Sequence, residues 1–288
     1  AGEFVWTGFD YLGEPTPYVP GDQFAQTEEG HVARSSYFGI VDLAGFPKDS
    51  YYNYRSLWHE DDNTVYLTPH WNWAGNEGEN IPVVLYTNGD EAELFLNGKS
   101  MGRRQKINPD QVKTSMKIAE GIDYSVTEDN EEDPYFEIVD AYRLRWMEVP
   151  YEAGEIKAVA YKDGQVIGES VVETAGEPDA LRLTPDRQNM MADGMDLCYV
   201  TVEMVDAQGR TCPLAMDNLE FKVEGSAKMM GVANGDAMGH DVFTDTKHSL
   251  FYGKAMVVLR SIPGKSGEAI LSVSTADGKQ SELTVLFE

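Results

Sequence analysis

The sequence predicts a mainly β protein: two successive immunoglobulin-like antiparallel β-sandwiches, preceded by a short strand–loop–helix segment. The main observation is that apolar residues recur at every second position from about residue 63 onward, in short runs separated by turn signals. This pattern is typical of strands with one buried face. Between residues 50 and 59 the large apolar residues recur instead at helical spacing, at Tyr51, Tyr54, Leu57 and Trp58.

The chain opens on a short apolar run, Phe4-Val5-Trp6. A run that is apolar at consecutive positions suits a strand covered on both faces, as in a parallel sheet. A polar loop follows it, and in α/β barrels the loop at this end of a strand helps to build the active site. The loop bears Asp10, Tyr11, Glu14 and Tyr18. On pattern alone, a buried strand with an ordinary loop is the commoner arrangement.

The rest of the leading segment predicts one helix. Residues 19–34 form a polar loop, residues 37–43 a short extended stretch, and Gly45-Phe46-Pro47 marks a turn. Asp49 or Ser50 suits the amino-terminal cap, because its side-chain oxygen can accept a hydrogen bond from a free backbone N–H. We therefore expect a helix over residues 50–59.

The first sandwich is predicted from the strand-like runs TVYLT, IPVVLYT, AELFL and RLRWMEV. Asn97-Gly98 follows AELFL, and Asp163-Gly164 separates IKAVAY from QVIGESVV. Both pairs predict hairpins, because a type I′ turn needs positive φ at two successive residues. Regular short strands with such turns are typical of a sandwich.

The second sandwich begins after Ala175-Gly176-Glu177-Pro178, which we interpret as a linker. Its predicted strands are ALRLTP, LCYVTVEMVD, LEFKVEG, AMVVLRSI, AILSVST and ELTVLFE, and Asp277-Gly278 joins the last two. In LCYVTVEMVD the alternation predicts one solvated and one buried face. Tyr199, Thr201 and Glu203 lie on the former, and Val200, Val202 and Met204 on the latter.

An acidic insertion interrupts the first sandwich. Residues 120–140 contain nine acidic residues and no Lys or Arg: Glu120, Asp123, Glu128, Asp129, Glu131, Glu132, Asp133, Glu137 and Asp140. Carboxylates suit hard cations, but residues 129–134 lack the loop glycine and distal Glu of a calcium-binding hand. A solvated insertion near residues 107–140 is favoured, and we expect no metal site. The predicted domains are residues 1–61, 62–175 and 176–288.

Composition excludes some partners. Of the 288 residues, 23 are Lys or Arg and 49 are Asp or Glu, a formal net charge of −26. Such a surface repels phosphate backbones and anionic lipid, so we expect no nucleic acid partner. Neutral sugars are not repelled. No apolar run approaches the roughly 18 residues that a membrane-spanning helix needs. Cys198 and Cys212 can either pair or remain thiols.

Several stretches resemble glycoside hydrolase family 2. GEFVWTGFDYLGEPTPY, near the start, and SSYFGIVDLAGFPKDSYYNYRS at residues 35–56 are similar to the last strand, loop and helix of that family's (β/α)8 barrel, in its bacterial β-galactosidase-like branch. AELFLNGKSMG and YRLRWMEVPYEAGEIKAVAY resemble the β-sandwich that follows the barrel. Residues 176–288 match less sharply, as an extra sandwich. The resemblance implies that the leading segment is the end of a TIM-barrel catalytic domain.

The resemblance implies a hydrolase without implying catalytic residues in this stretch. Glycoside hydrolysis generally needs two carboxylic side chains, and in the resembling family these are glutamates on barrel strands four and seven. The match here begins with strand eight. Glu3 and Glu14 lie within or beside the motif but correspond to neither glutamate. We therefore predict no catalytic residue here, and no cofactor.

Substrate binding is what strand eight contributes in that family. Trp6 matches a tryptophan at the floor of the sugar subsite, where its ring can lie against the apolar face of a hexose. Asp10 matches an acidic position after the strand, where it either hydrogen-bonds a sugar hydroxyl or braces the loop. Trp71 and Trp73 can also grip sugars, but packing between the barrel and the sandwich is the favoured interpretation. No Gly-x-Ser-x-Gly motif is present, and the five histidines are scattered.

Two functions follow as hypotheses. The first is the C-terminal portion of a retaining glycosidase acting on β-galactosides or related β-glycosides, whose partners are its carbohydrate substrate and the upstream part of the same enzyme. The second is a non-catalytic carbohydrate-binding or spacer module of tandem sandwiches. The family resemblance implies a periplasmic or extracellular location.

Overall fold

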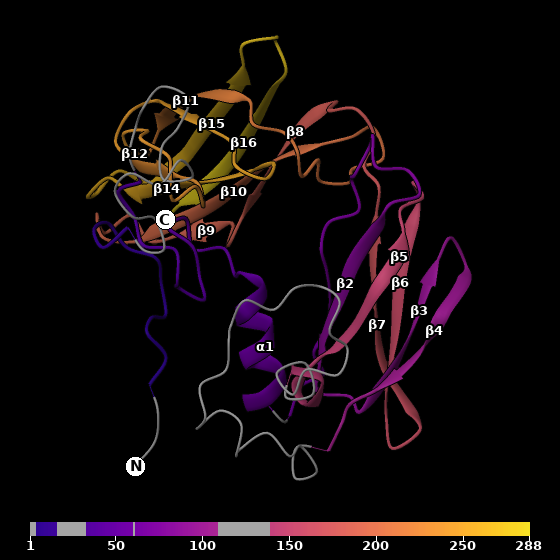
Figure 1. Ribbon diagram of the computed structural model, residues 1–288. Coiled ribbons are helices and arrows are strands. Elements are labelled where there is room, and N and C mark those ends of the chain that lie inside the picture. Colours follow the sequence, from indigo (N-terminus) through magenta and orange to yellow (C-terminus); the bar gives the residue numbers. More distant parts are fainter. Residues whose placement is uncertain (1–3, 16–32, 60, 109–138) are drawn as a thin grey trace. The chain divides into compact units, whose positions relative to one another are not determined.

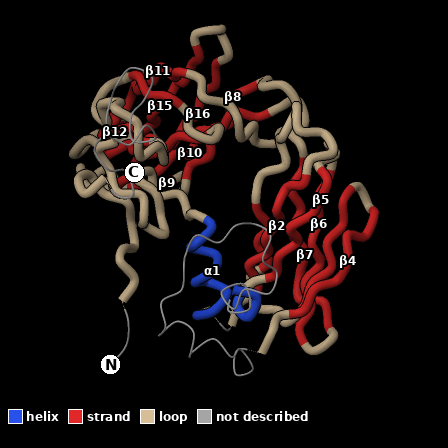
Figure 2. The backbone as a smooth tube through the Cα atoms, viewed as in Figure 1, coloured by secondary structure: helices blue, strands red, loops and turns tan. Residues whose placement is uncertain are grey.

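The computed structural model describes residues 4–15, 33–59, 61–108 and 139–288. The chain divides into two compact units, Asp49–Thr174 and a second that combines Ala1–Lys48 with Ala175–Glu288. Figure 1 labels their elements, and Figure 2 shows that strands dominate both. Among the described helices, none is long and apolar enough to cross a membrane.

The first unit is a sandwich of two antiparallel sheets beside one helix. The helix is α1 (Asp49–Trp58). One sheet has the order β1-β2-β5 and the other β4-β3-β6-β7. Their strands are β1 (Val65–Thr68), β2 (Asn80–Thr87), β3 (Glu91–Leu96), β4 (Lys99–Gln105), β5 (Leu144–Pro150), β6 (Glu155–Lys162) and β7 (Gln165–Glu173). Both sheets contribute to one core, in which Leu85, Leu94, Leu144 and Ile156 are buried.

The predicted hairpins of this sandwich are confirmed. Asn97 and Gly98 have φ values of 48° and 78°, and Asp163 and Gly164 have 50° and 75°. Two successive positive values are what a type I′ turn requires. These turns join β3 to β4 and β6 to β7.

The second unit contains the other predicted sandwich. One sheet has the order β12-β14-β10-β8 and the other β13-β11-β15-β16-β9. The strands are β8 (Ala180–Pro185), β9 (Asn189–Met190), β10 (Leu197–Val205), β11 (Asn218–Gly225), β12 (Ala227–Ala233), β13 (Lys247–Ser249), β14 (Lys254–Ser261), β15 (Gly267–Thr275) and β16 (Gln280–Phe287). Adjacent strands pair antiparallel except β16 with β9. Along β10, Val200, Val202 and Met204 are fully buried and Tyr199 is exposed, as the alternation predicts.

The predicted helix is confirmed, but the predicted strand at Phe4–Trp6 is not formed. In this region the structure has only isolated bridges, which pair Phe9 with Val41 and Leu12 with Ser35. A parallel strand is stabilised by neighbours on both sides, and no described strand runs beside residues 4–6. The assignment of residues 1–61 to the end of a barrel therefore stays a prediction.

Two other predictions remain untested. Most of the acidic insertion lies outside the described residues, as do Glu3 and Tyr18. The domain boundaries at residues 61 and 175 also stay predictions. In the structure, α1 belongs to the compact unit of the first sandwich, and residues up to Lys48 belong to that of the second.

Candidate sugar-binding site

The loop at residues 4–15 turns its large apolar side chains outward. Phe4 is 97% exposed, Trp6 is 73% exposed and Phe9 is 61% exposed. Single exposed apolar residues are common on protein surfaces, whereas a large contiguous apolar patch is typical of a binding surface. The exposed indole of Trp6 is the feature of this loop best suited to a sugar, because its flat ring matches the C–H face of a hexose.

The polar edge of Trp6 is held within the loop while the ring remains accessible. Trp6 forms a side-chain hydrogen bond with Tyr11, and the Tyr11 hydroxyl donates to the Glu14 carboxylate. This bond to Glu14 raises the pKa of Tyr11 above its ordinary value. The Tyr11 ring also packs edge-on against Phe38. The sequence placed Tyr11 and Glu14 on the loop but gave no sign that they orient Trp6.

Asp10 is the buried member of the predicted pair. It is 5% exposed, and its Oδ1 accepts a hydrogen bond of 2.8 Å from the Gly39 amide. Its Oδ2 lies 2.5 Å from Lys48 Nζ, and Lys48 also donates to the Tyr37 carbonyl. These contacts fit the bracing role better than a direct bond to a sugar hydroxyl, because a sugar would have to displace Lys48. Its substrate-binding role stays a prediction, as does that of Trp6.

Backbone hydrogen bonds hold the loop against residues 34–41. The amides of Ile40 and Val41 donate to the carbonyls of Thr7 and Gly8, at 3.1 and 3.0 Å. In the reverse direction, the Asp10 amide donates to Val41 over 2.9 Å. Further along, the Gly13 amide donates to the Arg34 carbonyl and the Ser36 amide to the Tyr11 carbonyl. The position of Trp6 therefore depends on the segment 33–48.

The described loop does not provide a pair of catalytic carboxylates. Asp10 is engaged by Gly39 and Lys48, and Glu14 by Tyr11. Glycosidases need one carboxyl to protonate the leaving oxygen and another to attack or to activate water. We assign neither role to these two residues. Within the part of the chain that the structure describes, no cluster of His, Cys, Asp and Glu could hold a metal ion.

Trp71 and Trp73 serve the first sandwich itself. Trp71 is fully buried, its indole donates to the Glu152 carbonyl over 2.9 Å, and its ring packs against Tyr151. Trp73 packs at the edge of the same core and donates to the His70 carbonyl. A sugar cannot stack on the covered ring of Trp71, and the half-buried ring of Trp73 stacks on His70. Both rings make these contacts inside the sandwich, and their packing between the barrel and the sandwich stays a prediction.

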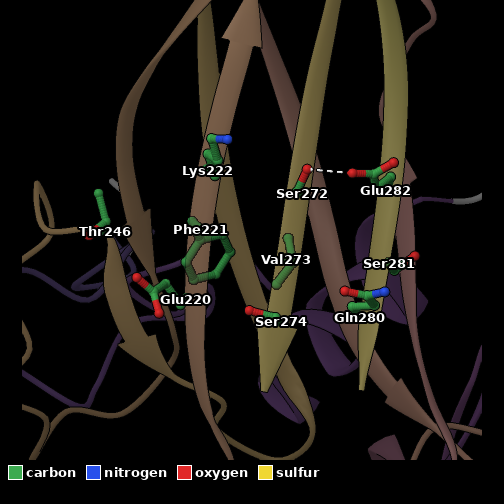
Figure 3. Close-up of a pocket in the computed structure, with 10 residues that line it drawn as sticks. All are labelled: Glu220, Phe221, Lys222, Thr246, Ser272, Val273, Ser274, Gln280, Ser281 and Glu282. Carbon is green, nitrogen blue, oxygen red and sulfur yellow. Dashed lines mark hydrogen bonds between the residues drawn. The ribbon is translucent and has the colours of Figure 1, made fainter. Parts of the chain in front are cut away.

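A groove of about 350 Å³, lined mainly by polar residues, lies on the five-stranded sheet of the second sandwich. Figure 3 shows Lys222, Ser272 and Glu282 in a row over β11, β15 and β16, with Ser272 bonded to Glu282. The other lining residues are Glu220, Phe221, Thr246, Val273, Ser274, Gln280 and Ser281. Phe221, the one aromatic residue among them, is 2% exposed. The groove therefore lacks the flat apolar platform that the Trp6 loop provides.

The two cysteines are separate buried thiols. Burial raises the pKa of Cys198 to about 12, and the pKa of Cys212 is raised by the same cause. A thiol that stays protonated at neutral pH is a poor nucleophile. Neither cysteine is a candidate for catalysis.

Family models match both sandwiches. A model described as glycoside hydrolase family 2 C-terminal domain 5 matches residues 181–284. A model for a domain of unknown function matches residues 78–168.

Named relatives match over nearly the whole chain. The chain is 41% identical to the beta-galactosidase BoGH2A of Bacteroides ovatus, over 100% of this chain and 28% of that protein. It is 30% identical to a putative beta-glucuronidase of Formosa agariphila, over 97% of this chain and 23% of that protein. The chain thus spans between a fifth and a third of the length of these two relatives.

Solved structures agree with these matches. A glycosyl hydrolase family 2 member from Bacteroides cellulosilyticus superposes with a TM-score of 0.78 and 28% identity, covering 100% of this chain and 36% of that one. A beta-glycosidase from Bacteroides vulgatus superposes with a TM-score of 0.77 and 30% identity, covering 99% of this chain and 30% of that one. The chain therefore belongs to glycoside hydrolase family 2, and it corresponds to a C-terminal part of the enzymes that it matches.

Proposed function

We propose that this chain is the C-terminal portion of a retaining glycoside hydrolase that acts on β-galactosides or related β-glycosides. Trp6 forms part of its sugar-binding subsite, and the two sandwiches are accessory domains. One observation carries the proposal: the Trp6 ring is 73% exposed while its polar edge is held by Tyr11. The 41% identity to a beta-galactosidase over the whole chain supports the substrate class.

A galactoside suits this loop better than a glucuronide. Residues 4–15 contain Asp10 and Glu14 and no Lys or Arg. The carboxylate of a glucuronide would find no cation on this loop, and it would be repelled by Glu14. A neutral hexose needs only a stacking surface and hydroxyl partners. We therefore favour β-galactosides, although three relatives are named as beta-glucuronidases or putative beta-glucuronidases.

The remainder of the proposed enzyme supplies the chemistry. The catalytic acid and nucleophile, and the other strands of the barrel, belong to an upstream part of the same polypeptide. No cofactor is required, because two carboxyl groups suffice for glycoside hydrolysis. A periplasmic or extracellular location is part of the proposal and rests on the family resemblance alone.

Kinetics of Trp6 variants in the parent enzyme test the subsite. Loss of the ring removes on the order of 1–3 kcal/mol of apolar burial. The kcat/KM of Trp6→Ala on a chromogenic β-galactoside should therefore fall by roughly 10- to 100-fold. Trp6→Phe keeps an aromatic ring and should retain more activity. Equal activity of Trp6→Ala and the wild type would refute the proposal.

A second assay compares the 288-residue chain with the parent enzyme. The purified 288-residue chain should hydrolyse neither a chromogenic β-galactoside nor a β-glucuronide, because Asp10 and Glu14 do not form a catalytic pair. The parent enzyme should hydrolyse the galactoside in preference. Hydrolysis by the chain alone that is lost on Glu14→Gln would place the active site here and contradict the assignment. If the parent enzyme binds sugar without hydrolysing it, the non-catalytic binding module is the better description.

A further inference from the structure

The segment at residues 33–48 lies between the Trp6 loop and the second sandwich, and it meets the loop at a glycine. A Cβ atom added to Gly39 would lie 2.2 Å from the Asp10 amide nitrogen and 2.4 Å from the Phe9 carbonyl carbon. No side chain fits at such distances from backbone atoms. The loop backbone therefore rests directly on Gly39.

A second glycine marks the contact with the sandwich. A Cβ atom added to Gly235 would lie 2.1 Å from Asp42 Oδ2 and 2.9 Å from Asp42 Cγ. The Asp42 side chain cannot simply swing away, because its Oδ1 accepts hydrogen bonds of 2.9 Å from the amides of Ala44 and Phe46. The turn at residues 42–46 is therefore seated on Gly235, which follows β12.

Arg34 provides a polar link between the same parts. Its guanidinium donates to the Asp241 carbonyl over 2.7 Å and lies over the Phe243 ring, 5.3 Å from its centre. The Arg34 carbonyl accepts the Gly13 amide on the Trp6 loop at 2.7 Å. One residue thus joins the sandwich to the loop.

The sandwich end of this link is itself fixed. Asp241 Oδ2 accepts hydrogen bonds from the Ser249 amide and hydroxyl, at 2.9 and 2.7 Å. Asn234 donates to the Ser249 carbonyl over 2.9 Å. Residues 234–243 are thereby anchored to β13, and they present a fixed surface to the segment 33–48.

We propose that the second sandwich sets the position of the Trp6 platform, and that Gly235 and Arg34 are positioning residues for the sugar subsite. The path runs from residues 234–243, through the segment 33–48, to the loop at residues 4–15. This inference rests on the proposed function, because it assigns a role within the same subsite. The second sandwich carries no residue of the predicted subsite. Under this proposal it nevertheless has a measurable effect on substrate affinity.

Gly235→Ala is the sharpest test, and Gly176→Ala is its matched control. Both glycines belong to the same compact unit, but a Cβ atom on Gly176 would find its nearest neighbour at 3.6 Å, an ordinary contact. Neither residue has the positive φ that strains an alanine. The two substitutions therefore add the same methyl group, and only Gly235→Ala pushes on the segment 33–48.

The first measurement is amide hydrogen exchange on the 288-residue chain. Gly235→Ala should speed exchange at the amides of Gly13, Ser36, Ile40 and Val41, while Gly176→Ala leaves them unchanged. The second measurement is steady-state kinetics in the parent enzyme. Since displacements of about 1 Å can cost on the order of 100-fold in rate, we expect kcat/KM for Gly235→Ala to fall by about 5- to 50-fold, mainly through KM. Arg34→Ala should act in the same direction, and Arg34→Lys should recover part of the loss.

The outcomes distinguish this inference from the proposed function. Unchanged exchange in both Gly235→Ala and Arg34→Ala would overturn the mechanical link. Faster exchange with unchanged kcat/KM, in an enzyme that Trp6→Ala impairs, would overturn the positioning role and leave the subsite intact. Full activity of Trp6→Ala would instead remove the proposed function, and the positioning role with it, while the exchange data would still report on the contact between the parts. If Gly235→Ala does not fold, the Arg34 pair decides between these outcomes.

Discussion

The leading segment and the two sandwiches differ in the side chains that they bury. In each sandwich the core cluster consists of hydrophobic residues, such as Leu85 and Leu259, which are fully buried. In the leading segment the buried residues include Asp10, Ser35 and Ser36, at 5%, 0% and 0% exposure. Several of its exposed residues are large and apolar: Phe4, Trp6, Phe9 and Leu12 are all more than half exposed.

This difference shows that each sandwich buries its own apolar side chains, whereas the leading segment leaves several of its own exposed. Apolar burial contributes about 25 cal/mol per Å², and each sandwich obtains it from its own two sheets. The leading segment keeps its shape through hydrogen bonds and the Asp10–Lys48 ion pair, so its apolar side chains remain available to a partner. We propose the upstream strands of the barrel, and a sugar at Trp6, as the partners of this surface.

Substitution of Trp71 should have the largest effect on stability. Trp71→Ala removes a fully buried indole and its bond to the Glu152 carbonyl, which should lower the free energy of unfolding by about 3–5 kcal/mol. Denaturant titration of the 288-residue chain measures it. Trp71→Phe keeps much of the volume and should lose less. If Trp71→Ala is as stable as the wild type, packing of Trp71 in the sandwich core does not contribute to the free energy of unfolding.

Removal of the buried carboxylate of the leading segment should have the next largest effect. Asp10→Ala leaves Lys48 without its ion-pair partner and the Gly39 amide without an acceptor. The cost should be about 1–3 kcal/mol, because an unpaired buried donor loses its hydration without compensation. Asp10→Asn is the control, since its side-chain oxygen can still accept from Gly39. Thermal unfolding compares the two, and a fully stable Asp10→Ala would show that the polar interior does not hold this segment.

The sandwiches could be predicted from sequence, because their signals are local. Alternation along β10 and the paired positive-φ turns at Asn97 and Asp163 depend only on neighbouring residues. Strand β12 escaped prediction because the register shifts between Met229 and Gly231, which breaks the alternation. The short strands β9 and β13 are too brief to show a period.

The site was only partly predictable, because its key contacts join residues far apart in the sequence. Trp6 and Asp10 are candidates through the family motif alone, and no local pattern distinguishes the exposed ring from the buried carboxylate. The close approach of Asp42 to Gly235 spans nearly 200 positions, and a lone glycine after a strand resembles any other turn. Such contacts become visible only once the fold brings the segments together.

A buried carboxylate, Asp206, also lies in the second sandwich. The pH dependence of stability tests whether its charge supports that sandwich. Burial opposes its ionisation, but hydrogen bonds from the Gly176 and Arg210 amides and from the Arg210 side chain hold the pKa of Asp206 well below its ordinary value. A carboxyl with a lowered native pKa stabilises the fold fully above its unfolded value of about 3.9, and this stabilisation is lost as the pH falls through the native pKa.

Asp206→Asn should therefore be less stable than the wild type at pH 7, and the difference should shrink below about pH 4. Urea titrations of both proteins at pH 7, 4 and 3 measure it. A difference that stays constant across this range would mean that the charge of Asp206 contributes nothing and that its hydrogen-bond geometry alone matters.

The smallest expected effect on stability belongs to Trp6, and it is the most informative. Because its ring is 73% exposed, Trp6→Ala in the 288-residue chain should change the free energy of unfolding by no more than about 0.5 kcal/mol, the usual range for surface positions. Phe4→Ala, at 97% exposure, is the matched control and should be equally silent. The two should separate in the parent enzyme, where Trp6→Ala lowers kcat/KM and Phe4→Ala acts only through packing of the barrel. A large loss of stability for Trp6→Ala in the chain alone would show that the ring contributes to the stability of the fold. The contrast between the leading segment and the sandwiches would then not hold for Trp6, the residue on which the proposed subsite depends.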